Sequence, residues 1–406
     1  MRRAEGTHAA AQDPVGGSLH DAELTEADSP APSPASALGT SHPARLPALT
    51  VLRGAAATAV VLYHIDGGVF AAIDLPRWLP FIGRLYLGVD LFFILSGFIL
   101  AHVHGAEFER FTPRAAGHFY ILRLARIYPV HATMMAAYLG LFLLQHAAGP
   151  GLGIGLRGRA AHYTASSFVE HLLLVEPYRA TWNFPAWSVS AEWFAYLWFP
   201  LLAATVLRLP AKWCAGLLAA VMAGFAVVFV ASFDRSLDQM GLGRVCFEFV
   251  AGCLAYRTSV GLPWRRLVAI ATPALALAGI LAAIPSWSDF GWLLIIGMLI
   301  VASGHPEARA PRWLLAPPLQ ALGEISYSLY ICQALVFATI GRAMQALLPH
   351  LRPTAQLALV PALLGVAIFS AAVLHRFVEQ PARGWMRSWL VGTARSARQR
   401  LQLMRA

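Results

Sequence analysis

Two ionisable side chains, Arg53 and His64, lie within the first long apolar stretch of the chain, residues 46–64. Ionisable groups inside a bilayer are costly and usually mark a functional site or a pathway. At about 100° per residue, positions 53 and 64 fall within roughly 20° of each other around a helix, about 16 Å apart along its axis. One helix face would then carry a possible base and, three turns below it, a cation. The alternative is a stray interior arginine and a histidine near the membrane surface.

Two carboxylates further along the chain could hold that imidazole. Asp90 opens the next apolar run, where it either orients His64 or is an ordinary acidic residue at a helix N-terminus. Glu192 lies inside a later apolar run, where an unpaired carboxylate is expensive. His64 and Arg53 are its candidate partners, and the competing interpretation is a purely structural ion pair.

A pair of arginines, Arg123 and Arg126, precedes Pro129 at a spacing that puts both on one helix face. With Arg110 and Arg114 nearby, they form a basic cluster suited to phosphate groups. Anchoring by the positive-inside rule explains the same residues without any ligand.

The remaining polar residues of the apolar runs have simpler explanations. Arg244 and Glu248 are four residues apart, which favours an ion pair within one helix. The polar groups of residues 323–330 favour hydrogen bonds between helices. His102 and His104 are too few for a metal site, and the four cysteines form no metal-binding cluster, so no metal is expected.

The composition indicates a membrane protein. The chain has 406 residues, of which 58% are hydrophobic and 13% charged, against about 25% charged in a typical soluble domain. Recurrent apolar runs predict an all-α polytopic fold of about ten transmembrane helices in the lipid bilayer. In a membrane protein, the distribution of the residues that give the formal net charge of +10 indicates how the chain is oriented across the bilayer. No nucleic-acid partner is therefore expected. The predicted spans are 47–66, 86–104, 126–146 (with a possible earlier start near Phe119), 186–207, 213–232, 241–257, 267–284, 289–304, 319–341 and 355–375.

Composition also divides the chain into three parts. Residues 1–44 are rich in Ala, Pro, Ser and acidic residues and predict a disordered cytoplasmic tail. Residues 45–385 form the membrane domain, and residues 386–406 form a basic cytoplasmic tail. Most Lys and Arg residues fall on the side of the N-terminus, which places both termini in the cytoplasm.

Six motifs in order resemble the acyltransferase 3 family of integral membrane acyltransferases, and the resemblance covers about residues 46–385. These motifs are Arg53 with His64, residues 88–98, Arg123 with Arg126, and residues 187–192, 326–330 and 379–381. The ninth helix of the family often has a histidine where this chain has Gln333, so no catalytic role is assigned there.

The resemblance implies transfer of an acyl group, typically acetyl, from acyl-CoA to a hydroxyl of a sugar or glycosylated acceptor. It also implies a bacterial cytoplasmic (inner) membrane location, with acyl-CoA as co-substrate and no permanently bound cofactor. Arg123 and Arg126 would grip the CoA phosphates.

The chemistry of that reaction suggests roles for the other candidate residues. His64 would be the general base that takes the proton of the acceptor hydroxyl. Arg53 would hold the donor or stabilise negative charge on the thioester oxygen, and Glu192 or Asp90 would fix the tautomer of His64. Direct transfer and a transient acyl-histidine both remain open.

A transporter or flippase for a polar or lipid-linked solute is the alternative, because it too needs charge inside the membrane. Acceptor-dependent release of free CoA separates the two, since only the enzyme consumes a thioester.

Overall fold

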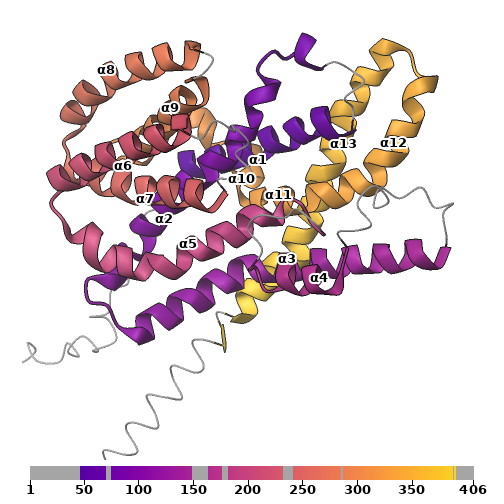
Figure 1. Cartoon of the computed structure of the whole chain (residues 1–406), viewed down its shortest axis with the longest axis horizontal. Helices are drawn as coiled ribbons and strands as arrows, with labels where there is room; N and C mark the ends of the chain where they lie inside the picture. The colour runs from indigo at the N-terminus through magenta and orange to yellow at the C-terminus, as the bar shows by residue number, and fades with distance from the viewer. Residues whose placement is uncertain are drawn as a thin grey trace, which may run out of the picture. The chain divides into compact units, whose positions relative to one another are not determined.

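The computed structural model describes residues 46–69, 75–148, 163–175, 182–231, 241–284, 287–386 and 388–389. All regular structure in these residues is helical (Figure 1), so the all-α prediction is confirmed. The helices are α1 (Pro47–His64), α2 (Gly88–His104), α3 (Pro113–Ala148), α4 (Ala165–Leu172), α5 (Ala186–Thr205), α6 (Ala211–Ala231), α7 (Gly241–Gly261), α8 (Trp264–Ala283), α9 (Ser288–Gly304), α10 (Pro317–Glu324), α11 (Ser326–Val336), α12 (Arg342–Leu347) and α13 (Pro353–Leu374).

Eight helical stretches of the described chain are long and apolar enough to cross a membrane. α9 is apolar but shorter, and α7 carries Arg244, Glu248 and Arg257. The count of ten crossings and the cytoplasmic termini stay predictions. The predicted tail 1–44 and nearly all of 386–406 lie outside the described residues. The eight stretches are Pro47–Gly67, Ile82–Phe108, Pro113–Ala148, Ala186–Arg208, Ala211–Val228, Trp264–Ala283, Ser326–His350 and Ala355–Met386.

Two predicted spans differ from the helices found. α3 begins at Pro113 rather than near 126, because its first turns carry arginines and are less apolar than its later part. Pro129 lies inside it without ending it, and Thr133 Oγ1 donates to the Pro129 carbonyl at 2.8 Å. The predicted span 319–341 is not one α-helix, because α10 ends at Glu324 and α11 begins at Ser326.

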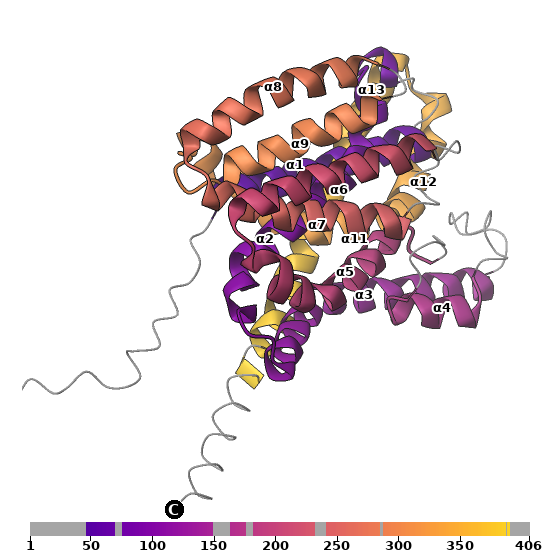
Figure 2. The same ribbon diagram turned by 60° about the vertical axis from the view of Figure 1, so that its left-hand side comes forward.

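Helices of the membrane domain cross one another at close range. α2 and α7 approach so closely at Gly97 that a Cβ there would collide with the Phe249 carbonyl, as expected for small residues between membrane helices. α8 and α9 lie side by side in both views, and α4 packs on α3 (Figures 1 and 2).

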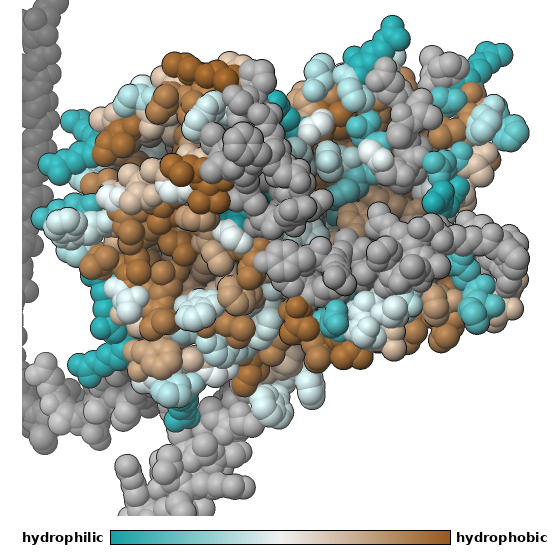
Figure 3. Space-filling view, in the orientation of Figure 1, coloured by the Kyte–Doolittle hydropathy of each residue, from teal (hydrophilic) through white to brown (hydrophobic). Residues whose placement is uncertain are grey.

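The outer surface of the helices is largely apolar. Exposed side chains such as Ile270, Leu277 and Ile280 on α8 project away from the core. Apolar residues dominate the left half of the face drawn in Figure 3, where α5 to α8 lie in Figure 1. Such a surface is stable in contact with lipid tails rather than water, which supports the integral membrane assignment.

Candidate active site

One cavity of about 110 Å³ lies among α1, α2, α3, α5 and α11. It is smaller than a typical ligand pocket of several hundred Å³, so it fits a group or an end of a ligand. Its polar lining consists of four charged residues, Arg53, Arg123, Arg126 and Glu192, and six hydroxyl residues, Ser96, Ser188, Tyr196, Ser326, Tyr327 and Tyr330.

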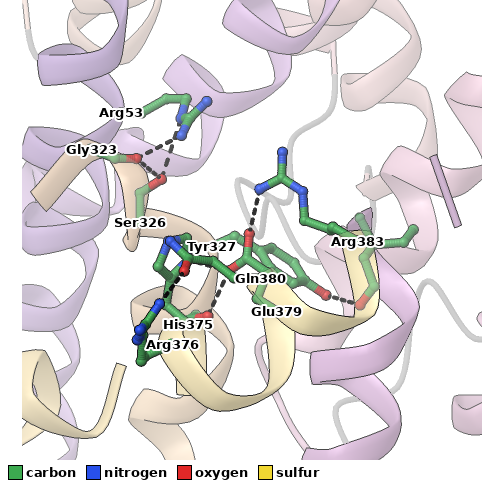
Figure 4. Close-up of polar contacts among 11 residues, drawn as sticks. Arg53, Gly323, Ser326, Tyr327, His375, Arg376, Glu379, Gln380 and Arg383 are labelled. Carbon is green, nitrogen blue, oxygen red and sulfur yellow. Dashed lines mark hydrogen bonds and ion pairs between the residues drawn. The ribbon is translucent and has the colours of Figure 1, made fainter. Parts of the chain in front are cut away.

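Arg53 lines the cavity. Its guanidinium contacts Gly323 and Ser326, on either side of the break between α10 and α11 (Figure 4). α1 and α10 cross so closely that a Cβ at Gly323 would collide with the Thr50 carbonyl. The guanidinium donates from Nη2 to the Gly323 carbonyl at 2.6 Å and from Nε to Ser326 Oγ at 3.3 Å. The last carbonyls of a helix lack intrahelical partners and carry partial negative charge. This helix end therefore holds Arg53 without a carboxylate.

Arg123 and Arg126 share one face of α3, as their spacing predicts, and both line the cavity. Arg123 stacks on the Phe119 ring at 5.7 Å, and its Nη2 lies 3.1 Å from His104 Nε2. Because a guanidinium only donates, Nε2 accepts, and the proton of His104 is on Nδ1, which lies 2.9 Å from Glu107 Oε1. A neutral imidazole thus links the Glu107 carboxylate to Arg123.

The cavity carries an excess of positive charge. Three guanidinium groups and one carboxylate line it, and no carboxylate of the described chain forms an ion pair with any of the three arginines. Arg110 and Arg114, which the sequence groups with Arg123 and Arg126, are exposed and do not line the cavity. Guanidinium groups without carboxylate partners are suited to binding phosphate or another anion.

Glu192 lines the same cavity but pairs with neither of its expected partners. Its Oε1 accepts a hydrogen bond from the Tyr196 hydroxyl at 2.5 Å, one turn along α5, and Ser96 Oγ lies 3.3 Å from the same hydroxyl. The expected pairing with His64 or Arg53 is therefore wrong. α5 supplies the partner itself, through the i, i+4 spacing.

His64 is half-buried at the end of α1 and does not line the cavity. Its Nδ1 lies 3.3 Å from Gln333 Oε1 on α11, and its ring meets the Phe184 ring with centroids 4.7 Å apart. Ser326, the partner of Arg53, lies on the same helix as Gln333. Arg53 and His64 therefore face one helical segment, and the predicted common face of α1 is confirmed.

Asp90 lies in a buried ion-pair cluster and not beside His64. Arg244 Nε is 2.5 Å from Asp90 Oδ1, and Arg244 Nη2 contacts Asp90 Oδ2. Arg244 Nε also lies 3.2 Å from Glu248 Oε1, as the spacing within α7 predicts. The expected role of Asp90 in orienting His64 is therefore wrong, because a cation on another helix binds this carboxylate. The other interpretation is confirmed in its position, since Asp90 lies in the first turn of α2.

Comparison with known proteins places these features in a family. The model of a family described as an acyltransferase domain matches residues 46–376. The chain belongs to the acyltransferase 3 family. It is 32% identical to acyltransferase MdmB of Streptomyces mycarofaciens over 375 residues, which cover 83% of this chain and 91% of MdmB. No solved structure matches.

Peptidoglycan O-acetyltransferase OatA of Listeria monocytogenes is 24% identical over 382 residues. O-acetyltransferase OatA of Staphylococcus aureus is 22% identical over 378 residues. The chain spans a little over half the length of these relatives, 56% and 58%, while the matches cover 83% and 84% of the chain itself. The apolar helices of membrane-spanning length and the family match together identify this acyltransferase as an integral membrane protein. Its O-acetyltransferase relatives support transfer of the acyl group to oxygen.

Two motifs of this acyltransferase, residues 326–330 and 379–381, contact each other (Figure 4). Ser328 Oγ donates to Glu379 Oε2 at 2.8 Å, and the same carboxylate contacts His375 and Arg383 at 3.0 and 3.2 Å. The hydrogen bonding expected for residues 323–330 is confirmed here and by the 2.7 Å contact between the hydroxyls of Ser188 and Tyr330.

Sequence reasoning gave no role to Gln333, the residue that contacts His64 in this acyltransferase. A signal was present: Ser326 and Gln333 are seven residues apart, so they share a face of α11 in the same way that Arg53 and His64 share a face of α1. Placing these two helix faces against each other pairs Arg53 with Ser326 and His64 with Gln333.

Proposed function

We propose that the protein transfers an acyl group from acyl-CoA to a hydroxyl of a sugar or glycosylated acceptor. The observation that carries this proposal is the cavity with Arg53, Arg123 and Arg126, whose guanidinium groups have no carboxylate partners in the described chain. CoA carries several phosphates, and planar guanidinium groups bind phosphate through paired hydrogen bonds. In this proposal the cavity holds all or part of the phosphate end of acyl-CoA.

The separation of Arg53 and His64 supports the same donor. In acyl-CoA a long flexible arm separates the phosphates from the thioester. Residues that hold the phosphates and a base that acts at the thioester must therefore be well apart. Arg53 and His64 are about 16 Å apart along α1 and on one face. This distance favours Arg53 as a donor-binding residue over the alternative role at the thioester oxygen.

His64 acts as the general base in this proposal. One ring nitrogen takes the proton of the acceptor hydroxyl as the oxygen attacks the thioester carbonyl. The new C–O bond forms, the C–S bond breaks, and the proton passes to the leaving thiolate to give free CoA. Glu192, with Tyr196, lines the cavity beside the donor-binding arginines and limits their excess positive charge.

Relatives from bacteria support a bacterial cytoplasmic membrane as the location. With the termini in the cytoplasm, as the distribution of basic residues predicts, the beginning of α1 faces the cytoplasm. The donor then enters from that side, and His64 lies nearer the opposite face.

The test is acceptor-dependent release of CoA by the purified full chain in detergent or nanodiscs, with acetyl-CoA and a sugar acceptor. His64→Ala should lower the rate at least about 100-fold, the usual contribution of a general base. His146→Ala is the matched control, because His146 is exposed near the end of α3. A wild-type rate in His64→Ala excludes His64 as the base. Wild-type protein that moves a solute but releases no CoA is a transporter or flippase.

A further inference from the structure

The side-chain amide of Gln333 has only one orientation that satisfies both of its neighbours. Its Nε2 donates to the backbone carbonyl of Tyr330 at 2.9 Å, and its Oε1 faces His64 Nδ1 at 3.3 Å. Turning the amide over would place its oxygen against the Tyr330 carbonyl, and two acceptors repel each other. Gln333 is fully buried, so water cannot relieve that repulsion.

This orientation determines which nitrogen of His64 carries the proton. An amide oxygen only accepts, so the Nδ1 facing it must donate. In a neutral imidazole with its proton on Nδ1, the lone pair is on Nε2.

We infer that Gln333 is a positioning residue that holds His64 in the Nδ1–H tautomer and leaves Nε2 free to take the acceptor proton. The inference rests on the proposed role of His64 as the base. It assigns to a neutral amide the function that the sequence suggests for Glu192 or Asp90. An amide sets the tautomer without placing another charge inside the membrane, where an unpaired charge is costly.

Aromatic neighbours hold the imidazole plane in this orientation. The rings of Phe184 and Tyr63 meet His64 edge-on, with centroids 4.7 and 5.2 Å away. A half-turn of the imidazole would bring a C–H group to Gln333 and lose the hydrogen bond. Gln333 therefore selects the tautomer, while the two aromatic rings restrict rotation.

The tautomer can be measured without any assay of activity. The full chain, labelled with ¹⁵N in its 14 histidine rings, is studied by NMR in micelles, and the signals absent from His64→Ala are assigned to His64. We expect the Nδ1 signal of a protonated nitrogen and the Nε2 signal of an unprotonated one. Gln333→Met should produce a mixture of tautomers. A wild-type spectrum with the proton on Nε2 overturns the inference.

Kinetics test whether the tautomer matters for the reaction. Gln333→Met keeps the size of the side chain but removes the acceptor, and it should lower kcat about 10- to 100-fold with little change in KM for the donor. Gln356→Met is the matched control, because Gln356 Nε2 also donates to a backbone carbonyl, that of Leu348 at 2.8 Å. The control should leave kcat within about twofold.

A second variant guards against a folding defect. Gln333→Glu keeps an acceptor for Nδ1 and, as the neutral acid, a donor for the Tyr330 carbonyl, so it should recover much of the kcat lost in Gln333→Met. A wild-type kcat in Gln333→Met overturns the inference, even if His64→Ala is inactive. If His64→Ala keeps its activity, the proposed base fails instead, whatever the tautomer.

Discussion

The arginines of the membrane domain have two opposite kinds of surroundings. Arg244, on α7, is 3% exposed and contacts two buried carboxylates, Asp90 and Glu248. Arg53 and Arg123 line the cavity and have neutral partners instead, the Gly323 carbonyl and the His104 imidazole.

This difference is the one expected between a structural charge and a charge that binds a ligand. A buried charge destabilises a protein unless partners compensate it. Arg244 is compensated inside the protein and so has little capacity left for a ligand. The arginines of the cavity are held by neutral groups that orient them but do not neutralise them. We therefore expect an anionic ligand to complete the cavity, and none to bind at Arg244.

The largest effect should come from Arg244→Leu. This change leaves Asp90 and Glu248 buried without their cation and should cost about 3–5 kcal/mol of stability, a large part of the total for a typical domain. The measurement is the yield of monodisperse protein and its thermal midpoint in detergent. Arg265→Leu, at an exposed position on α8, is the control. Normal yield and midpoint in Arg244→Leu would show that the cluster does not hold α2 to α7.

Arg53→Leu should have the opposite profile, with low activity and a nearly unchanged thermal midpoint. The Gly323 carbonyl keeps a donor in this variant, because Ser326 Oγ also lies 2.8 Å from it. Loss of charge-assisted hydrogen bonds to the donor should reduce kcat/KM for acyl-CoA about 10- to 100-fold. CoA release and thermal melting are measured on the same sample. A fall in midpoint as large as that of Arg244→Leu would make Arg53 a structural residue.

The positions of the arginines could be predicted only where the pattern is local. Arg53 with His64, and Arg123 with Arg126, each lie on one helix, so helical periodicity alone gives their common faces. The same rule gave the Arg244–Glu248 pair. The bounds of α1, α5 and α9 also follow from apolar runs with clear ends.

The missed contacts join residues far apart in the chain. Asp90 meets Arg244 across 154 positions, and His64 meets Gln333 across 269. Such pairs depend on which helices pack together and at what rotation, and periodicity within one helix carries no information about either. Without that knowledge, the sequence offers Glu192 or Asp90 as the partner of His64 and gives no role to the buried Gln333.

Arg126→Lys should have a smaller effect, on donor affinity alone. Lysine keeps the positive charge but loses the planar fork that binds phosphate through two hydrogen bonds. We expect KM for acyl-CoA to rise about three- to tenfold, with kcat nearly unchanged. Arg110→Lys is the matched control, because Arg110 is exposed and does not line the cavity. Equal effects of the two changes would assign both arginines to general attraction of the donor by positive charge.

The smallest effect should follow from replacing the whole ion-pair cluster by apolar residues, as Asp90→Leu, Arg244→Met and Glu248→Leu together. Removing all three charges leaves no buried group uncompensated, and such replacements are often neutral or stabilising. The thermal midpoint should therefore return close to that of the wild type, and CoA release should persist. Activity is the decisive measurement, since retained turnover without Asp90 excludes that carboxylate from catalysis. A stable but inactive triple variant would place the cluster in the reaction and remove the contrast between Arg244 and the arginines of the cavity.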